Sequence, residues 1–213
     1  MEELTIIQKI AAYAIPIIFA ITVHEAAHGY VAKYFGDMTA HYLGRISLNP
    51  LKHIDPVGTI ILPALTIMLG GILFGWAKPV PINFSNLRNS KKNMMWVALA
   101  GPFSNLLMAI FWTFLFARVQ FFPESSIIFL SAMSLAGIQI NLILMVLNLL
   151  PIPPLDGGRV AVSLLPYPWS SYFESLERYG LFIIIFLLFS GVLGSILFPL
   201  INISKSIIFT IFG

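Results

Sequence analysis

The chain has 213 residues, of which 58% are hydrophobic and only 10% are charged. Since a soluble globular domain usually carries about 25% charged residues, 12 Lys and Arg with 9 Asp and Glu cannot cover a water-exposed surface of this size. The mean hydropathy of +0.90 predicts a membrane protein, and the formal net charge of +3 is too scattered to indicate a nucleic-acid partner.

The sequence contains no cysteine, which excludes disulfides, thiolate metal sites and a thiol nucleophile. Any metal must therefore be held by His, Asp or Glu.

Four long apolar segments and one interrupted apolar segment follow one another along the chain. The long segments cover residues 6–35, 92–118, 124–156 and 178–205, and the interrupted one covers 56–77. A spanning helix needs about 20 apolar residues, which the last three long segments each supply. The sequence predicts an all-α polytopic membrane protein with about four to six transmembrane or re-entrant segments. We expect one membrane-embedded domain over 1–213, with a core at about 5–165 and a C-terminal helix at about 179–204.

The first segment contains His24-Glu25-Ala26-Ala27-His28, which fits the pattern His-Glu-x-x-His. Residues i and i+4 lie on one face of a helix, so both imidazoles can reach one metal ion. Glu25 lies beside them, where it can take a proton from water whose pKa zinc lowers to about 7. The alternative is a pair of helix histidines with a Glu that snorkels to the interface. It is disfavoured because three such residues in an apolar segment are costly unless they serve a site.

The connections at 36–55 and 78–92 are polar and contain short runs compatible with β-strands, at 45–48 and 79–82. We therefore expect short membrane-associated β-strands. Their unpaired edges, within 45–50 and 75–83, could bind an extended substrate as an added strand. The alternative is that both stretches are ordinary loops. His53 is expected to be an interfacial histidine, the alternative being a position over the metal.

A catalytic zinc keeps three protein ligands and one open position. Asp156 is the one acid in an apolar context late in the chain, in Asn148-Leu-Leu-Pro-Ile-Pro-Pro-Leu-Asp156-Gly157-Gly158. The prolines end the preceding helix, and the glycines let the backbone approach a site closely. Asp156 is therefore the predicted third ligand. The alternative is that it caps a helix beginning at Gly157.

Together these motifs resemble the site-2 protease family of intramembrane zinc metalloproteases, over roughly residues 10–165. The stretches that carry the resemblance are His24-Glu25-x-x-His28, Asn148-x-x-Pro151-x-x-x-x-Asp156-Gly157, Ala100-Gly101-Pro102-Phe103-Ser104-Asn105 and Phe74-Gly75-Trp76-Ala77-Lys78-Pro79-Val80-Pro81. No PDZ-like insertion or CBS module is recognisable, so the chain is similar to the minimal branch. How larger members select substrates cannot be carried over.

The resemblance implies one zinc ion per chain and cleavage of a helix-breaking substrate segment within the membrane, near the cytoplasmic side. It also implies that Asn148 contacts the substrate near the metal. A bond from Asn148 to the end of its own helix, before Pro151, is an equally good interpretation. Gly101 and Asn105 are expected to allow close helix packing rather than to serve the chemistry.

The predicted site constrains the topology. The histidines near the end of the first segment and Asp156 just past the fourth must meet at one depth, so these segments run in the same direction and the third runs opposite. Residues 56 and 92 then lie on one side, and 56–77, too short for two full crossings, should form a re-entrant or interfacial hairpin.

The distribution of basic residues indicates which side holds the site. The side of the site carries Lys33, Arg45, Lys52, Lys78, Arg88, Lys91, Lys92, Arg159 and Arg178, and the other side carries Lys9, Arg118 and Lys205. By the positive-inside rule, the active site should face the cytoplasm of a cell-membrane protein.

The sequence favours an intramembrane zinc endopeptidase whose partners are the lipid bilayer and the transmembrane segments of substrate proteins. A membrane metal-ion transporter built on the same residues and an inactive relative that only binds membrane helices are the alternatives. Glu25 argues against transport, which needs no general base, and the complete motifs argue against inactivity.

Overall fold

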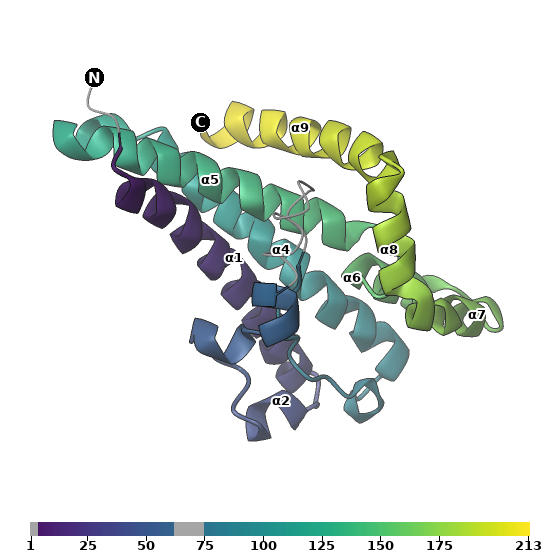
Figure 1. The fold of residues 1–213 in the computed structure, drawn as a ribbon. Coiled ribbons are helices and arrows are strands. Elements are labelled where there is room, and N and C mark those ends of the chain that lie inside the picture. Colours follow the sequence, from purple (N-terminus) through teal and green to yellow (C-terminus); the bar gives the residue numbers. More distant parts are fainter. Residues whose placement is uncertain (1–3, 62–74) are drawn as a thin grey trace.

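The computed structural model describes residues 4–61 and 75–213, and these contain helices and connections but no strand. Three long helices lie side by side (Figure 1): α1 (Ile6–Tyr34), α4 (Ser90–Phe116) and α5 (Glu124–Leu149). A fourth, α9 (Val192–Phe212), packs on α5 and α4. Within the described residues, these four are long and apolar enough to cross a membrane. The predicted all-α polytopic architecture is confirmed.

Shorter elements connect the long helices. They are α2 (Thr39–Tyr42), η1 (Pro50–His53), η2 (Pro56–Ile61), η3 (Phe84–Asn86), η4 (Val119–Phe121), α6 (Asp156–Leu164), α7 (Trp169–Ser175), η5 (Leu176–Tyr179) and α8 (Gly180–Phe189). The prediction of one helix over 179–204 is wrong, because this region forms two helices, α8 and α9, which are separated by a turn (Figure 1). Gly191 has a φ of +77° there, a left-handed conformation that glycine adopts at little cost.

Small residues let the central helices approach one another closely. Lipid tails are as apolar as the side chains, so helix association in a membrane depends on close packing. The buried face of α1 accordingly carries Ala12, Ala20, Ala26, Gly29 and Ala32. On α5, a Cβ added at Gly137 would lie 2.4 Å from the Trp112 ring of α4. This close approach allows polar side chains of neighbouring helices to meet.

The contacts between helices show their directions. The pairs are His24–Asn105 and His28–Val97 between α1 and α4, and Asn105–Asn141 and Trp112–Gly137 between α4 and α5. In each set, residue numbers rise on one helix while they fall on the other. Both neighbours of α4 are thus antiparallel to it, so α1 and α5 run in the same direction, as predicted.

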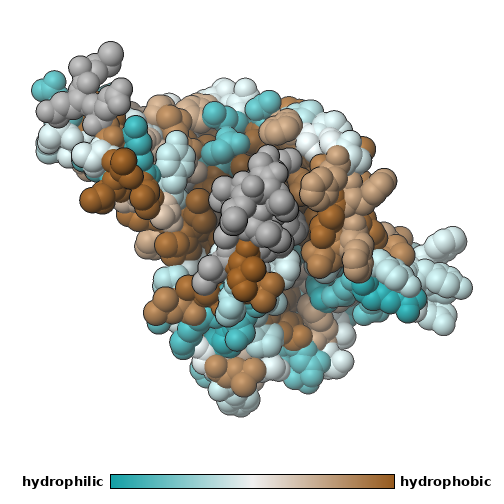
Figure 2. Space-filling view, in the orientation of Figure 1, coloured by the Kyte–Doolittle hydropathy of each residue, from teal (hydrophilic) through white to brown (hydrophobic). Residues whose placement is uncertain are grey.

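The surface has the distribution of a multi-pass membrane protein. In Figure 2, hydrophobic side chains cover much of the middle of the view, while hydrophilic ones gather in the lower part, around α2 and beside α7, and in a smaller group at the upper edge. The exposed apolar side chains on the outer faces include Ile6, Ile7, Ile10, Phe19, Phe182, Phe186, Phe189, Phe198 and Ile211. In water such faces would be a liability, whereas hydrocarbon accommodates them.

The two ends of the interrupted segment lie together. The backbone N–H of Trp76 donates to the carbonyl oxygen of Gly58 at 3.0 Å, and the Thr59 hydroxyl donates to the Trp76 carbonyl oxygen at 2.9 Å. Adjacent ends are what a hairpin requires. Residues 62–74, on which the re-entrant prediction depends, lie outside the described part of the chain.

The stretches 45–48 and 79–82 do not form the predicted strands. The two prolines of the second stretch have no N–H to give to a ladder. The Arg45 guanidinium instead donates to the carbonyl oxygens of Lys78 and Pro79, at 3.1 Å each. The two stretches are thus held beside each other by a side chain, and the expectation of membrane-associated β-strands there is wrong.

A buried carboxylate fixes the connection that follows. Asp37 is completely buried just past the end of α1 and accepts hydrogen bonds from the Thr39 hydroxyl, the Asn83 N–H and the Asn86 side-chain amide. Burial by itself raises the pKa of Asp37, but the combined effect of these hydrogen bonds is larger and opposite. The pKa of Asp37 therefore lies below its ordinary value. The charged form therefore ties the 83–86 turn to the end of α1.

Candidate metal centre

The first candidate ligands are two histidines one turn apart on α1. His24 and His28 are buried, with 7% and 8% of their surfaces exposed. Their Nε2 atoms lie 3.1 Å apart because positions i and i+4 project from one face of the helix. The local geometry predicted from the motif is therefore present.

The other ring nitrogens determine the tautomers. The Nδ1 atom of His24 lies 2.6 Å from the Asn105 side-chain oxygen, and that of His28 lies 2.7 Å from the Val97 carbonyl oxygen. Both oxygens can only accept, so both Nδ1 atoms donate. In the neutral imidazoles the Nε2 atoms then carry lone pairs, which is the form that binds a metal.

The third candidate ligand comes from a later part of the chain, just past the end of α5. Asp156 is the first residue of α6, and its Oδ2 lies 3.3 Å from each histidine Nε2. This oxygen is buried without a hydrogen-bond partner in the described part of the chain. The N-cap position belongs to Leu155 and no side chain caps the helix, so the capping interpretation of Asp156 finds no support.

The donor set fits a metal ion. Two imidazole lone pairs and a carboxylate oxygen lie within 4.8 Å of one another, and no proton lies between them in the tautomers described above. Three acceptors so close together repel one another, and a bound cation removes this repulsion. Two nitrogens with one carboxylate are a common catalytic zinc set. His24, His28 and Asp156 are the residues that would hold the ion.

A glycine of α4 leaves room at this point. A Cβ built on Gly101 would lie 2.4 Å from His28 Nε2 and 2.5 Å from His24 Nε2. Carbon cannot approach a nitrogen so closely without a bond, so a side chain at position 101 would occupy the space in front of the ligand atoms. Gly101 thus allows α4 to pack closely on α1, as expected, and the side chains that it lets approach are the two candidate ligands.

We therefore expect Gly101→Ala to abolish metal binding. The added methyl group collides with both imidazoles, and the buried face of α1 leaves them little room to retreat. Zinc content of the purified protein measures the effect. Gly194→Ala in α9 is the matched control, because its Cβ would meet only the Phe198 side chain, at 3.2 Å. Full zinc occupancy in Gly101→Ala would show that position 101 does not border the metal.

Sequence reasoning missed a network of amides beneath the histidines. Asn105, which is completely buried, accepts from His24 Nδ1 and donates to the Ala20 carbonyl oxygen and to the Asn141 side-chain oxygen at 2.9 Å. Asn141 in turn donates to the Gly137 carbonyl oxygen at 2.8 Å. Asn105 therefore orients His24, and its expected role in helix packing was incomplete. Two amides buried in apolar helices were the signal.

The predicted general base has a defined partner as well. Glu25 is half-buried, and its Oε2 accepts from the Val80 N–H at 2.7 Å. Val80 packs against α1, where a Cβ at Gly29 would lie 3.2 Å from its side chain. The 78–82 stretch thus holds one carboxylate oxygen in place next to the two histidines of the motif.

Two other predicted positions have contacts of their own. His53 is buried, its Nε2 lies 2.8 Å from the Ser47 carbonyl oxygen, and its carbonyl oxygen accepts from the Lys78 N–H. It does not belong to the candidate metal group of the described residues. Asn148 donates to the Leu144 carbonyl oxygen at 3.0 Å, the bond to its own helix that sequence analysis had weighed. Its contact with substrate stays a prediction.

The chain is similar to several known proteins over most of its length. It is 39% identical over 207 residues to "Putative zinc metalloprotease YwhC" of Bacillus subtilis, covering 93% of this chain and 90% of that protein. It is 33% identical over 186 residues to "Putative zinc metalloprotease Rip2" of Mycolicibacterium smegmatis, covering 86% and 69%. The Mycobacterium tuberculosis protein of the same name is 36% identical over 139 residues, or 65% and 51%.

Residues 124–191 also match the family described as Peptidase family M50. This part contains α5, the Pro-rich turn with Asp156, and α6 to α8. No solved structure matches the chain.

Proposed function

The chain belongs to the M50 peptidases, the site-2 protease family of zinc metalloproteases, and from this premise we propose that it cuts peptide bonds within transmembrane segments of other membrane proteins. The observation that carries the proposal is the convergence of three metal-binding atoms inside a bundle of apolar helices. In this proposal His24, His28 and Asp156 bind the zinc, and Glu25 is the general base.

The depth of the site supports an intramembrane substrate. His24 lies four residues past Ala20, the middle of α1, which is about 6 Å along a helix axis. The hydrocarbon core is about 30 Å thick, so a helix centred on it holds His24 well inside. A peptide bond reaching this site therefore comes from a segment that is itself in the membrane.

The chemistry follows from the ligand set and Glu25. When bound, zinc acts as a Lewis acid and lowers the pKa of water to about 7. Glu25 lies on the same helix between the two histidines, and the Val80 N–H engages one of its oxygens. The other oxygen is the one we assign to accept the proton from the attacking water and to pass it to the leaving amine.

We propose that Asn148 contacts the substrate. It stands in the last turn of α5, one residue before the helix ends and eight before Asp156. Its amide N–H₂ group binds the Leu144 carbonyl oxygen, while the side chain is half-buried rather than enclosed. The side-chain oxygen is then suited to accept a hydrogen bond from an extended substrate backbone.

We also propose that the site opens toward the cytoplasm. The end of α1 that follows the histidines continues into the connection with Arg45, and Arg159 of α6 lies over the Phe84 ring at 4.8 Å. These basic residues thus lie on the side of the membrane that is closer to the site. The positive-inside rule assigns this side to the cytoplasm.

Substrates with helix-breaking residues near the cut are expected to be cleaved faster than all-Leu segments. A helix shields its amides in its own hydrogen bonds, so the scissile carbonyl must first be exposed. Two glycines lower helix stability by about 2 kcal/mol, which corresponds to roughly 30-fold. Cleavage of two model substrates by the purified protein measures this. Glycines placed outside the spanning segment are the control, and equal cleavage of all substrates would contradict the requirement for unwinding.

The same preparation separates the proposal from its alternatives. A metal transporter would move zinc across a proteoliposome membrane and leave the model substrate intact. An inactive relative would bind the substrate without cutting it. Cleavage inside the spanning segment, located by mass spectrometry, is the expected result.

A further inference from the structure

The element that presents Asp156 has little to hold it by itself. α6 has nine residues, begins without a side-chain cap and carries Gly157 and Gly158 in its first turn. Helices this short are not stable in isolation, and two glycines weaken the first turn further. The position of the Asp156 carboxylate must therefore be set by what packs around α6. The elements that pack on α6 are α4, α7 and α5. The corner between α7 and α8 adds the two contacts described next.

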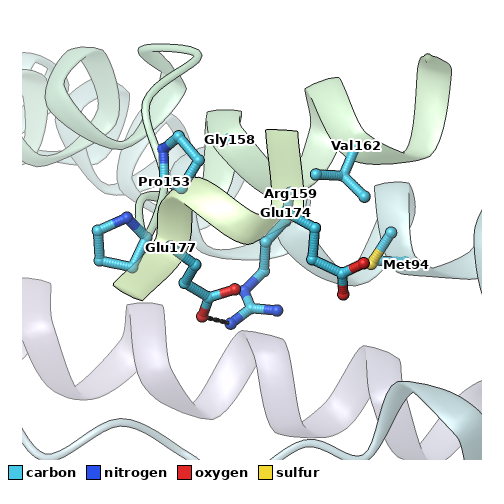
Figure 3. Close-up of a pocket in the computed structure, with 8 residues that line it drawn as sticks. Met94, Pro153, Gly158, Arg159, Val162, Glu174 and Glu177 are labelled. Carbon is cyan, nitrogen blue, oxygen red and sulfur yellow. Dashed lines mark hydrogen bonds and ion pairs between the residues drawn. The ribbon is translucent and has the colours of Figure 1, made fainter. Parts of the chain in front are cut away.

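An ion pair joins this corner to α6. Arg159, three residues after Asp156, donates to the Glu177 carboxylate of η5 at 2.5 Å (Figure 3). The Arg159 guanidinium also lies over the Phe84 ring at 4.8 Å. One side chain of α6 is thus held by two segments that are distant in the sequence.

The surroundings of this ion pair are closely packed. The cavity beside it has a volume of about 10 Å³, room for one water at most (Figure 3). The rest of its lining consists of Met94, Pro153, Pro154, Gly158, Val162 and Glu174. The side chains of Arg159 and Glu177 are 31% and 37% exposed. An ion pair this exposed contributes little to global stability, so its effect is local.

A second contact comes from the first residue of α8. A Cβ added at Gly180 would lie 2.3 Å from the Pro153 carbonyl oxygen and 2.3 Å from Pro154 Cδ. Gly180 is buried, so the α8 backbone rests directly on the turn that leads to Asp156. A Cβ at Gly157, next to Asp156, would in turn lie 2.3 Å from the Leu149 carbonyl oxygen.

We propose that Glu177 and Gly180 form a buttress that sets the position of Asp156 relative to the two histidines. Glu177 acts through Arg159 on one flank of α6, and Gly180 acts through Pro153 on the other. Both are positioning residues for the metal centre, supplied by a part of the chain outside the stretch that carries the motifs. The inference rests on the proposed role of Asp156 as a ligand.

Zinc affinity tests the buttress without reference to hydrolysis. We expect Glu177→Ala and Arg159→Ala each to weaken zinc binding about tenfold, the lower end of the effect of lost supporting contacts around a metal site. Since the two side chains act as a unit, the double variant should be no weaker than either single one. Competition with a chelator measures affinity. Arg178→Ala is the matched control, because Arg178 is exposed and lies over Tyr179 rather than against α6.

Gly180→Ala examines the second contact. The new methyl group must push the turn at Pro153, so zinc binding should weaken by a comparable factor. Gly194→Ala, in the neighbouring helix α9, should bind zinc like the parent. Circular dichroism and elution in detergent report whether each variant folds. Glu177→Gln removes the charge of the side chain but keeps its shape. This variant is used in place of Glu177→Ala if the alanine variant misfolds.

The outcomes separate the buttress from the ligand assignment. Parent-like zinc affinity in Asp156→Ala would overturn the ligand set itself. Weak binding by Asp156→Ala with parent-like binding by the Glu177 and Arg159 variants would overturn the buttress alone. Independent, additive losses in the Glu177 and Arg159 variants would likewise contradict an action through one ion pair.

Discussion

Replacing Glu25 with glutamine is expected to abolish peptide hydrolysis while zinc stays bound. Glutamine keeps the size of the side chain, and its amide oxygen can still accept the Val80 N–H, which lies 2.7 Å from the carboxylate in the parent. It cannot take up a proton, and general-base catalysis typically contributes about 10²–10⁴-fold. The fall should appear in kcat rather than KM, because the substrate contacts are unchanged.

The measurement is cleavage of a model transmembrane substrate by purified protein, with zinc content determined on the same sample. Glu124→Gln is the control, because Glu124 is an exposed carboxylate at the start of α5 and should leave kcat unchanged. Substantial activity in Glu25→Gln would assign the proton transfer to another group. Loss of zinc together with activity would point to a structural role for Glu25.

Removing any one of the three candidate ligands is expected to empty the metal site. Each of His24, His28 and Asp156 contributes one atom to a group whose members lie within 4.8 Å of one another, so two ligands remain in each alanine variant. The loss of affinity should exceed the roughly 10–100-fold that removal of an outer hydrogen-bond partner costs. Zinc per chain, measured after dialysis against a weak chelator, reports the effect, and hydrolysis should disappear with the metal.

His41→Ala is the matched control for the two histidine variants. His41 is exposed on α2, and its Nδ1 atom lies 3.3 Å from the Lys33 ammonium group. Zinc content and activity should both match the parent. Full zinc in any one ligand variant would remove that residue from the site, while the other two would keep their assignment.

The two results together also distinguish the candidate functions. A metal transporter loses its function with the ligands but has no need of a basic oxygen at position 25. An inactive relative shows no hydrolysis in the parent protein. The expected pattern, in which Glu25→Gln keeps zinc and loses cleavage, fits only a hydrolase.

The amino-acid sequence by itself determined the local geometry of the histidine pair and the positions of α1, α4 and α5. The i, i+4 spacing of His24 and His28 brings their ring nitrogens to one face whatever the rest of the chain does. Apolar segments of about 20 residues have to form helices in lipid, because no water satisfies their backbone groups. The requirement that Asp156 meet the histidines then gave the relative directions of α1, α4 and α5.

The tertiary structure decided which groups stand around the site. Asn105 contacts His24 across 81 positions of sequence, Val80 contacts Glu25 across 55, and Glu177 reaches the Asp156 helix through Arg159. Such contacts depend on how helices pack, and helical periodicity specifies a face but not its neighbour. For the same reason the supposed strand at 79–82 became a support for Glu25, because a backbone N–H bonds to whichever acceptor the packing brings to it.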